Sequence, residues 1–249
     1  MTYDLTDRTA VVTGAASGIG AATALLLARS GATVALLARR TERITGLAER
    51  ITADGGRAFA VTADVTRDLS EVVRTVHDTC GTVDLVVNNA GVMLGNPVVD
   101  GRTDEWKRML DTNVGGVLNV LDAFSEDLVA AAERGPSDLV NISSVGAHQT
   151  FRDFSVYTAT KAAVTHLSAN LRTELGPLGV RVTNVEPGIT ESELAGHVDN
   201  TAVRQTLATW FESAGHLTSA EVADVVAYAT SRPRHVNLRH LVVLPTTQV

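Results

Sequence analysis

The sequence predicts a single-domain α/β protein built on a doubly wound, seven-stranded parallel sheet with helices on both faces. Short apolar runs alternate with helix-compatible segments along the chain, as in repeated strand–helix–strand units. The chain is 45% hydrophobic but only 4% aromatic, so its core is aliphatic, which suits parallel strands covered on both faces. A glycine-rich turn also joins the first strand to the first helix.

Length, charge and cysteine content narrow the class of protein. The 249 residues suffice for one large core, and without linkers or repeats we expect one domain over residues 1–249. The net charge of -7 carries no basic block, so no nucleic-acid partner is expected. Cys80 is the only cysteine, which excludes an internal disulfide and fits a reducing compartment. The N-terminus lacks the apolar core of a signal peptide, and apolar runs such as Ala24–Ala28 are too short to span a bilayer. We therefore expect a soluble, cytoplasmic protein with no membrane partner.

The first strand, Thr9–Val12, runs into a glycine-rich turn and a helix that extends through Ala28. Such a turn lets the backbone approach a pyrophosphate, which sits on the free N–H groups of the helix N-terminus. The spacing Gly-x-x-x-Gly-x-Gly differs from the common dinucleotide fingerprint, and a glycine-rich turn can also be purely structural. The strand–turn–helix context favours nucleotide binding, and the candidate residues are Gly14, Ser17, Gly18, Ile19 and Gly20.

The second strand, Thr33–Leu37, ends in Ala38, Arg39 and Arg40. An acidic residue near this point would hold the ribose 2′-hydroxyl of NAD. Two arginines would instead pair with the 2′-phosphate of NADP, so the sequence favours NADP(H). The alternative is that both arginines form a solvated face before the helix at 42–50.

The third and fourth strands, Ala58–Val61 and Val83–Val87, are each followed by polar residues. Asp64, next to Val65, is placed to accept a hydrogen bond from an adenine amine, or to help start the helix over residues 68–79. Side-chain amides at the carboxyl end of a parallel strand lie at the ligand edge of such a sheet. The candidates after these strands are Asp64, Val65, Asn89, Ala90 and Gly91.

Residues 103–128 read as one long helix that is interrupted at residues 113–116. Asn113 and the two glycines after it are poor helix-interior residues, so a local distortion is expected beside a buried site. The fifth strand, Leu139–Ile142, then delivers Ser143 and Ser144 to the ligand edge.

The helix predicted over residues 155–175 carries Tyr157 and Lys161, which project from one face because they are four residues apart. A nearby ammonium favours the phenolate and lowers the tyrosine pKa from its usual value near ~10, which suits proton exchange with a carbonyl or alcohol oxygen. Ser144 would donate a hydroxyl to the same oxygen. Taken alone, such a pair is also compatible with a solvated helix face, and two serines with an ordinary turn.

The last third of the chain continues the pattern. The sixth strand, Val180–Val185, is followed by Pro187 and Gly188, and residues 191–216 are predicted to form a helical flap over the pocket. A helix over residues 219–230 begins at a cap at Thr218 or Ser219. Residues 241–244 form the seventh strand.

Together these motifs resemble the short-chain dehydrogenase/reductase family of about 250 residues, over essentially the whole chain. The matching residues, in chain order, are Thr13, Gly14, Gly18, Gly20, Asn88, Asn89, Ala90, Gly91, Asn113, Ser144, Tyr157, Lys161, Pro187 and Gly188. The resemblance implies a Rossmann fold, an NADP(H) cofactor and no metal.

The resemblance also implies a role for individual residues. In the Asn113–Ser144–Tyr157–Lys161 tetrad, Tyr157 is the general acid and Ser144 orients the substrate oxygen. Lys161 binds the nicotinamide ribose and depresses the tyrosine pKa, while Asn113 holds a water. Ser144 rather than Ser143 is implied because the family places this serine thirteen residues before the tyrosine. The cofactor positions implied are Arg39 at the 2′-phosphate, Asp64 near adenine, and Ile189 and Thr190 near the nicotinamide amide.

Two features depart from the family pattern. Ser192 stands where many members have threonine, and the C-terminal residues 235–248 lack the common glycine-rich tail. This ending, together with residues 89–94, resembles the branch of clavulanic acid (clavaldehyde) dehydrogenases and serine-type 3-hydroxy acid dehydrogenases. The resemblance also implies a homodimer or homotetramer that pairs the helices bearing Asn113 and Tyr157.

The leading hypothesis is an NADP(H)-dependent oxidoreductase that interconverts an aldehyde or ketone and an alcohol. The second is a 3-hydroxy acid dehydrogenase, with Arg152 or Arg204 in the pocket to bind the substrate carboxylate. The third, from another class, is a non-catalytic NADP(H)-sensing protein, against which the complete tetrad argues. We expect the pocket to be lined by the flap and by Met93, Leu94, His148, Gln149, Phe151 and Phe154.

Overall fold

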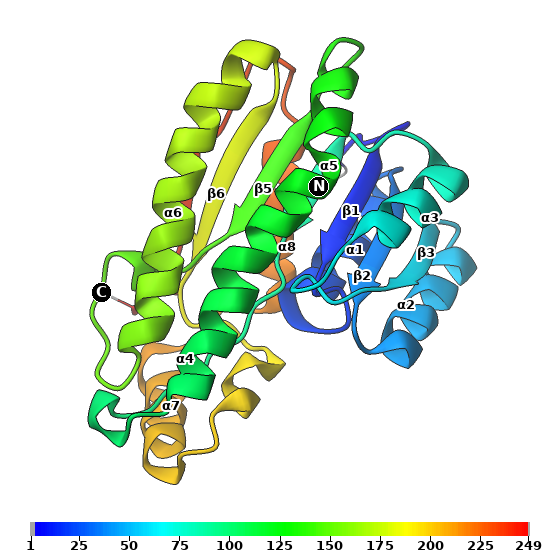
Figure 1. The fold of residues 1–249 in the computed structure, drawn as a ribbon. Coiled ribbons are helices and arrows are strands. Elements are labelled where there is room, and N and C mark those ends of the chain that lie inside the picture. The colour runs from blue at the N-terminus through cyan, green and yellow to red at the C-terminus, as the bar shows by residue number, and fades with distance from the viewer. Residues whose placement is uncertain (1–2, 249) are drawn as a thin grey trace.

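The computed structural model describes residues 3–248 and contains one sheet of seven parallel strands (Figure 1). The strands are β1 (Thr9–Thr13), β2 (Thr33–Ala38), β3 (Arg57–Thr62), β4 (Leu85–Asn88), β5 (Asp138–Ile142), β6 (Arg181–Pro187) and β7 (His240–Val243). Their order is β3-β2-β1-β4-β5-β6-β7. The predicted doubly wound α/β fold is confirmed. After β3 the chain crosses back to pair β4 with β1, and the carboxyl ends of these two strands border the crevice where such folds bind ligands.

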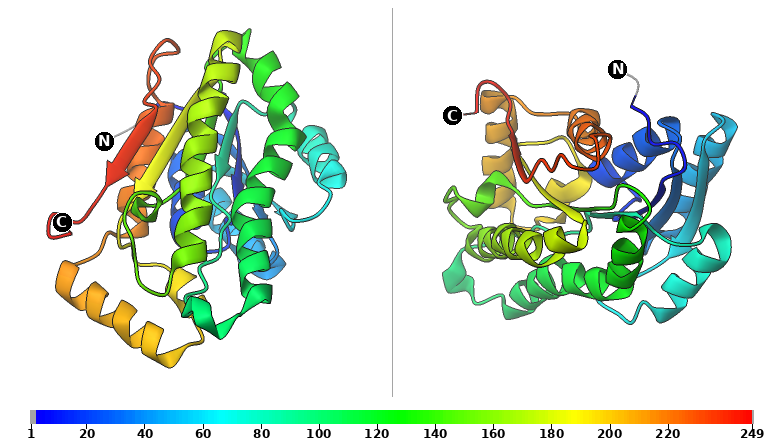
Figure 2. Two further views of the ribbon diagram at one scale, coloured as in Figure 1. Left: turned by 60° about the vertical axis from the view of Figure 1, so that its left-hand side comes forward. Right: turned by 90° about the horizontal axis from the view of Figure 1, so that it is seen from above.

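Helices cover both faces of the sheet. They are α1 (Gly18–Arg29), α2 (Thr41–Ala53), α3 (Ser70–Cys80), α4 (Thr103–Leu110), α5 (Gly116–Ala132), α6 (Ser155–Leu175), α7 (Thr201–Ala214) and α8 (Ser219–Thr230). One aliphatic core lies between the sheet and α1, α2 and α8, and a second lies between the sheet and α3, α5 and α6. The view from above in Figure 2 shows these two helical layers with the sheet between them.

The predicted long helix is interrupted as expected. A π-helical turn, η2 (Asp111–Gly115), separates α4 from α5 and contains the buried Asn113. Single-turn π-helices of this kind are frequent at functional sites. The helix predicted over residues 68–79 begins two residues later than expected, at Ser70. Asp68 lies before the helix, and its side chain accepts a hydrogen bond from the Ser70 N–H, which has no partner within the helix.

Short helical turns complete the structure: η1 (Val98–Asp100), η3 (Val145–Ala147), η4 (Gly176–Leu178) and η5 (Glu193–His197). Helix α8 begins at the predicted cap Thr218, whose hydroxyl accepts from the Glu221 N–H while the Glu221 carboxylate accepts from the Thr218 N–H. This reciprocal capping box satisfies two free donors at the helix start.

A buried ion network ties the amino-terminal ends of four strands together. Arg8, just before β1, bonds to Asp84 at 2.5 Å and to Asp138 of β5 at 2.7 Å. Arg181 of β6 holds both oxygens of Asp138 at 2.7 Å. All four side chains are largely buried, so charge pairing there is essential. The network lies at the opposite edge of the sheet from the carboxyl ends of the strands.

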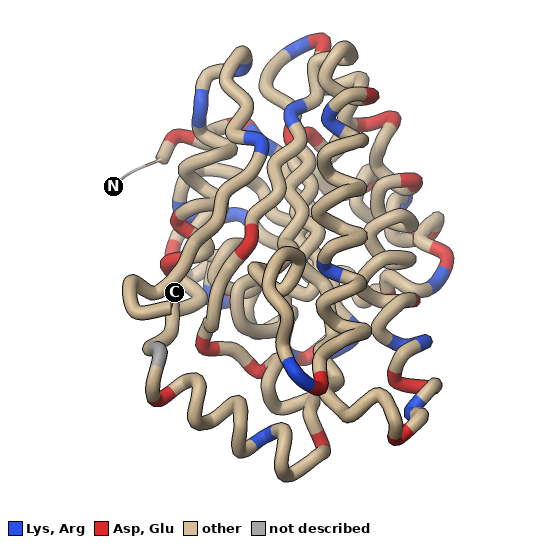
Figure 3. Tube along the Cα trace, turned by 90° about the vertical axis from the view of Figure 1, so that its left-hand side faces the viewer, with Lys and Arg blue, Asp and Glu red and all other residues tan. Residues whose placement is uncertain are grey.

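Charged residues are otherwise interspersed along the chain. Figure 3 shows acidic and basic positions alternating along the trace rather than gathered in separate segments. None of the helices among residues 3–248 combines the length and the apolar character that crossing a membrane requires.

Candidate active site

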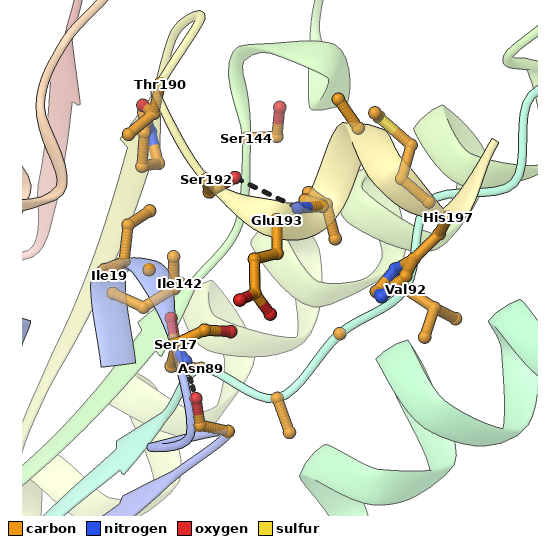
Figure 4. A pocket seen from close by; sticks show the side chains of 18 of the residues that line it. Ser17, Ile19, Asn89, Val92, Ile142, Ser144, Thr190, Ser192, Glu193 and His197 are labelled. Carbon is orange, nitrogen blue, oxygen red and sulfur yellow. Dashed lines mark hydrogen bonds between the residues drawn. The ribbon is translucent and has the colours of Figure 1, made fainter. Parts of the chain in front are cut away.

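A cavity of about 410 Å³ opens at the carboxyl edge of the sheet (Figure 4). Most predicted site residues line it: Gly14, Ser17, Gly18, Ile19, Arg39, Arg40, Asp64, Val65, Asn89, Ala90, Gly91, Ser144, Tyr157, Lys161, Pro187, Gly188, Ile189 and Thr190. Gly20 and Asn113 do not line the cavity. They pack against residues that do, Gly20 against Gly14 and Asn89 and Asn113 against Gly91. The structure therefore gathers residues from all parts of the sequence around one space.

The glycine-rich turn has the shape that a phosphate cradle requires. Gly14 and Gly18 adopt left-handed backbone conformations with φ of 65° and 55°. A Cβ on Gly14 would lie 2.8 Å from the Asn89 side chain, and one on Gly20 would overlap both Asn89 and the Gly14 carbonyl. Gly20 thus allows close packing and does not line the cavity. Ser17 makes no side-chain cap to α1, so the first N–H groups of this helix are available to an anion.

Arg39 and Arg40 are both exposed at the mouth of the cavity, but only one of them is paired. Arg40 donates to Glu193 at 2.6 Å and to Ser17 at 2.8 Å. Arg39 forms no hydrogen bond or ion pair with any of residues 3–248 and lies near enough to Asp64 to help lower the pKa of that carboxyl. Arg39 is therefore the cation that is free to meet a phosphate. Figure 4 shows the Glu193 carboxylate pointing from η5 toward Ser17.

Thr13 and Asn89 brace the junction between β1 and β4. The Thr13 hydroxyl accepts hydrogen bonds from the N–H groups of Asn89 and Ala90, both at 3.0 Å. The Asn89 amide in turn donates to the Thr13 carbonyl at 3.0 Å. These bonds fix the carboxyl ends of two adjacent strands at the point where the glycine-rich turn begins.

Asp64 and Val65 border the next part of the cavity. The Asp64 carboxylate accepts from the Thr66 N–H at 3.0 Å and from its hydroxyl at 2.8 Å. Burial raises the pKa of Asp64, but these bonds and the nearby Arg39 more than offset it, so the net shift is downward and the group is ionised at neutral pH. Asn119 of α5, which no local sequence pattern identified, donates to the Val65 carbonyl at 2.8 Å and holds this turn in place.

Asn113 is only 1% exposed, and its side chain is fully engaged within the protein. Its oxygen accepts from the Val92 N–H at 2.8 Å, and its amide donates to the Val92 carbonyl at 2.9 Å and to Thr160 at 3.0 Å. Asn113 therefore ties the loop that follows β4 to α6. The distortion predicted from its position places it directly behind Gly91, beside Lys161.

Ser143 and Ser144 occupy different environments, although both border the cavity. The Ser143 hydroxyl lies 2.9 Å from the Lys161 carbonyl and from the Thr165 hydroxyl, inside the protein. The Ser144 oxygen accepts from the Gly146 N–H at 3.1 Å, which leaves its proton free to be donated. This difference agrees with the choice of Ser144, whose role remains a prediction.

Tyr157 and Lys161 lie together on α6, both buried, with the Lys161 Nζ 5.9 Å from the centre of the Tyr157 ring. Burial raises the pKa of Tyr157 to about 12, and the hydrogen bond with Ser144 opposes this only in part. Burial also lowers the pKa of Lys161 to about 8. The net shift of the tyrosine pKa is therefore upward rather than downward as predicted, because burial of the phenolate outweighs the hydrogen bond with Ser144. The effect of the Lys161 ammonium on this pKa stays a prediction.

The far end of the cavity is closed by the C-terminal segment. The Gln248 side chain accepts from the Ile189 N–H at 2.9 Å and lies against Gly188. The Thr190 hydroxyl donates to the Gly188 carbonyl at 3.0 Å. Gln248 was not among the predicted site residues, since nothing near it in the sequence marks it as a partner of residues sixty positions away.

The segment at 191–216 forms the predicted flap. Helix α7 and turn η5 bring Leu207, Trp210 and Phe211 to the cavity, opposite Met93 and Tyr157. Trp210 contacts Phe151 and Phe154, with ring centres 5.4 and 6.0 Å apart. His197 also lines this end, and burial and the nearby arginines lower its pKa, so it is neutral at pH 7.

Several predicted pocket residues point elsewhere. Leu94 is buried in the core beneath the flap, and His148 and Gln149 do not line the cavity, because the loop after Ser144 turns His148 toward Glu186. Arg152 borders a separate depression, and Arg204 lies on the outer side of α7, bonded to the Asp199 carbonyl. Neither arginine supplies the carboxylate-binding cation that a 3-hydroxy acid substrate needs.

The chain was compared with known proteins. The family model described as short chain dehydrogenase matches residues 8–202. An uncharacterized oxidoreductase of Staphylococcus aureus (strain USA300) is 34% identical over 241 residues, which is 97% of this chain and 98% of that protein.

Two solved structures are also similar over nearly their whole length. The closed form of a serine dehydrogenase complexed with NADP+ has a TM-score of 0.87 and 28% identity, covering 97% of this chain and 96% of that one. A 3-oxoacyl-[acyl-carrier protein] reductase with bound NAD from Brucella melitensis has a TM-score of 0.83 and 30% identity, covering 96% and 90%.

Proposed function

Because the chain belongs to the short-chain dehydrogenase/reductase family, a family of oxidoreductases, we propose that it interconverts a carbonyl compound and an alcohol with NADP(H). The observation that carries this proposal is the convergence on one cavity of a phosphate cradle, an unpaired arginine, and Ser144, Tyr157 and Lys161.

The residues present fit a nicotinamide dinucleotide phosphate. The free N–H groups at the start of α1 suit the pyrophosphate, and Arg39 suits a 2′-phosphate. Asp64 and Val65 would hold the adenine, and Gly188, Ile189 and Thr190 the nicotinamide. The cofactor supplies the hydride, while the protein supplies position and the proton.

Tyr157 acts as the proton donor to the carbonyl oxygen during reduction. Its raised pKa keeps the phenol protonated at neutral pH, which is the state a general acid needs. Ser144, whose hydroxyl hydrogen-bonds with Tyr157, can donate its proton instead to the same oxygen and stabilise the charge that develops there. Lys161 is held by the Ile142 carbonyl at 2.9 Å, so its ammonium is fixed close to Tyr157.

The substrate class follows from the lining at the flap end. Met93, Phe151, Leu207, Trp210 and Phe211 make that end apolar and aromatic. The polar groups of the same cavity include the catalytic residues and the neutral His197. We therefore propose a hydrophobic or aromatic aldehyde or ketone, in preference to a 3-hydroxy acid or another carboxylated substrate.

Purified protein is tested for NADPH oxidation with aromatic aldehydes, alkyl ketones and 3-oxo acids, with NADH in parallel. Tyr157→Phe removes only the acidic hydroxyl, and Tyr228→Phe, at an exposed position on α8, is the matched control. We expect turnover of the apolar carbonyls with NADPH, weak turnover with NADH, none in Tyr157→Phe, and full activity in the control.

The other outcomes identify the alternatives. Preferred turnover of 3-oxo acids would restore the hydroxy acid hypothesis. Tight NADPH binding that is unchanged in Tyr157→Phe, with no turnover of any carbonyl, would instead favour the non-catalytic sensor.

We further propose a homodimer or homotetramer. Leu110 of α4 and Leu118 of α5 are 51% and 44% exposed. Large exposed apolar groups on a helical face favour a covering partner. Light scattering of the purified protein should give a multiple of the chain mass, and Leu118→Glu should reduce it. A monomer in the wild-type protein would contradict this proposal.

A further inference from the structure

Two histidines and a buried glutamate meet at the β6–β7 edge of the sheet, outside the cavity. They are His148, just after η3, Glu186 of β6 and His240 of β7, and their ligand atoms all lie within 4.8 Å of one another. The proposed catalytic chemistry uses none of them. β7 is the edge strand beside β6 (Figure 2), so the cluster is close to solvent.

The sheet register builds this cluster. His240 pairs with Asn184, and Glu186 lies two residues beyond Asn184. Side chains two residues apart in a strand share a face, and those paired across strands lie side by side. Asn184, Glu186 and His240 therefore project to the same side of the sheet. His148, which directly follows η3, contacts Glu186 on that side.

The glutamate is set up as a ligand. It is fully buried, and one carboxylate oxygen, Oε1, accepts from the Thr165 hydroxyl at 2.6 Å and from the Asn184 amide at 2.9 Å. The other oxygen, Oε2, has no well-aligned hydrogen-bond donor among residues 3–248, although the nearby His240 ring helps to lower the pKa of the Glu186 carboxyl. The Nε2 atoms of His148 and His240 nevertheless lie 3.1 and 2.9 Å from Oε2. A buried carboxylate oxygen without a donor is rare and costly.

From this geometry we propose that His148, Glu186 and His240 bind a zinc-like divalent transition-metal ion. Imidazole nitrogens and a carboxylate oxygen are zinc ligands, at distances of about 2.0–2.2 Å. Donor atoms around a tetrahedral zinc lie about 3.3 Å apart. The distance from Oε2 to each imidazole nitrogen is therefore within a few tenths of an ångström of what the metal needs, and all three ligand atoms lie within 4.8 Å of one another. The cation satisfies Oε2, and both histidine side chains are partly exposed, which gives entry and leaves a coordination position for water.

The site is joined to the loop that carries Ser143 and Ser144. Thr165, which holds Glu186 in place, also contacts Ser143, and His148 ends the turn that begins at Ser144. A bound metal would therefore fasten this loop to β6 and β7. It would raise the thermal stability of the protein by binding the folded state alone.

The test uses the tag-free, full-length protein after treatment with a chelator. Zn²⁺ is titrated in competition with a chromophoric chelator, and thermal unfolding is followed with and without Zn²⁺. His148→Ala and His240→Ala remove exposed ligands, while His235→Ala, at an exposed position in the connection before β7, is the matched control.

We expect one Zn²⁺ per chain and a rise in Tm for the wild-type protein and the control. Each ligand variant should bind Zn²⁺ at least about tenfold more weakly and lose the rise in Tm. Equal affinity in all four proteins, or no binding at micromolar Zn²⁺, would overturn the proposal and leave the histidines as hydrogen-bonding neighbours of Glu186.

Discussion

Arg39 and Arg40 are adjacent in the chain but differ in what they are free to do. Arg40 is engaged by Glu193 and Ser17, whereas Arg39 lines the cavity without a partner among residues 3–248. The Arg40–Glu193 pair is about half exposed, and such pairs contribute only about 0–1 kcal/mol. The Arg40–Glu193 pair can therefore separate when a phosphate competes for Arg40. Glu193 nevertheless places a negative charge near any phosphate bound there.

We predict that Arg39→Ala weakens NADPH binding by about tenfold or more, since a hydrogen bond to a charged group contributes about 1.5–3 kcal/mol. NADH binding should hardly change, because it lacks the 2′-phosphate. Arg40→Ala should weaken NADPH binding less, because Arg40 must first release Glu193. Fluorescence titration with both nucleotides measures these effects, and Arg29→Ala, in an exposed pair with Asp54, is the control. An equal loss of affinity for NADH and NADPH would show that Arg39 does not bind the 2′-phosphate.

Tyr157 gives a prediction about pH. Its pKa is raised to about 12, so the protonated form is favoured and the phenolate appears only as the pH approaches that value. The tyrosinate absorbance difference between wild type and Tyr157→Phe should stay flat through neutral and mildly alkaline pH. Alcohol oxidation, which needs the phenolate, should rise with pH over the same range until Lys161 loses its proton around its pKa of about 8. A tyrosinate signal from Tyr157 at neutral pH would contradict this assignment.

At the scale of elements, the flap depends on the start of α7. The Asn200 side chain accepts from the N–H groups of Ala202 and Val203 at 3.0 and 3.2 Å, and donates to Asn96 at 3.1 Å. It thus caps the helix and ties it to the loop after β4.

We predict that Asn200→Ala destabilises α7 by about 1 kcal/mol, the usual effect of losing an N-cap. KM for the carbonyl substrate should rise several-fold, since Leu207, Trp210 and Phe211 lie on this helix, while NADPH affinity stays unchanged. Steady-state kinetics distinguishes the two constants. Asn170→Ala, which removes only an exposed bond within α6, is the control. An unchanged KM would mean that α7 does not close over the substrate.

At the scale of the whole molecule, the ion network and the cavity lie at opposite edges of the sheet. The network of Arg8, Asp84, Asp138 and Arg181 fastens the amino ends of β1, β4, β5 and β6. Stability and chemistry can therefore be perturbed separately.

We predict that Asp138→Asn lowers the free energy of unfolding by about 3–5 kcal/mol, because it leaves two buried guanidinium groups without their shared carboxylate. Urea unfolding should show a lower midpoint, whereas NADPH affinity of the folded protein should not change. Asp54→Asn, in an exposed pair, should have an effect below about 1 kcal/mol. Equal stability of the Asp138 variant and the wild type would show that the network is not structural.

The sequence by itself determined the sheet, its helices, and the identity of most cavity residues. These features are local: strands and helices follow from short-range hydrophobic periodicity, the left-handed Gly14 and Gly18 mark the turn, and Tyr157 and Lys161 share a face because they are four residues apart on a helix. Parallel strands then carry whatever follows them to one edge of the sheet.

Only the tertiary structure decided which neighbours these residues have. Glu193 reaches Arg40 across 153 residues, and Gln248 reaches Ile189 across 59. His148 turned to Glu186 instead of the pocket, and Arg152 remained outside it. The pKa of Tyr157 moved opposite to the predicted direction. Such outcomes depend on how loops pack and how deeply a group is buried, which are sums over distant contacts that a local pattern does not contain.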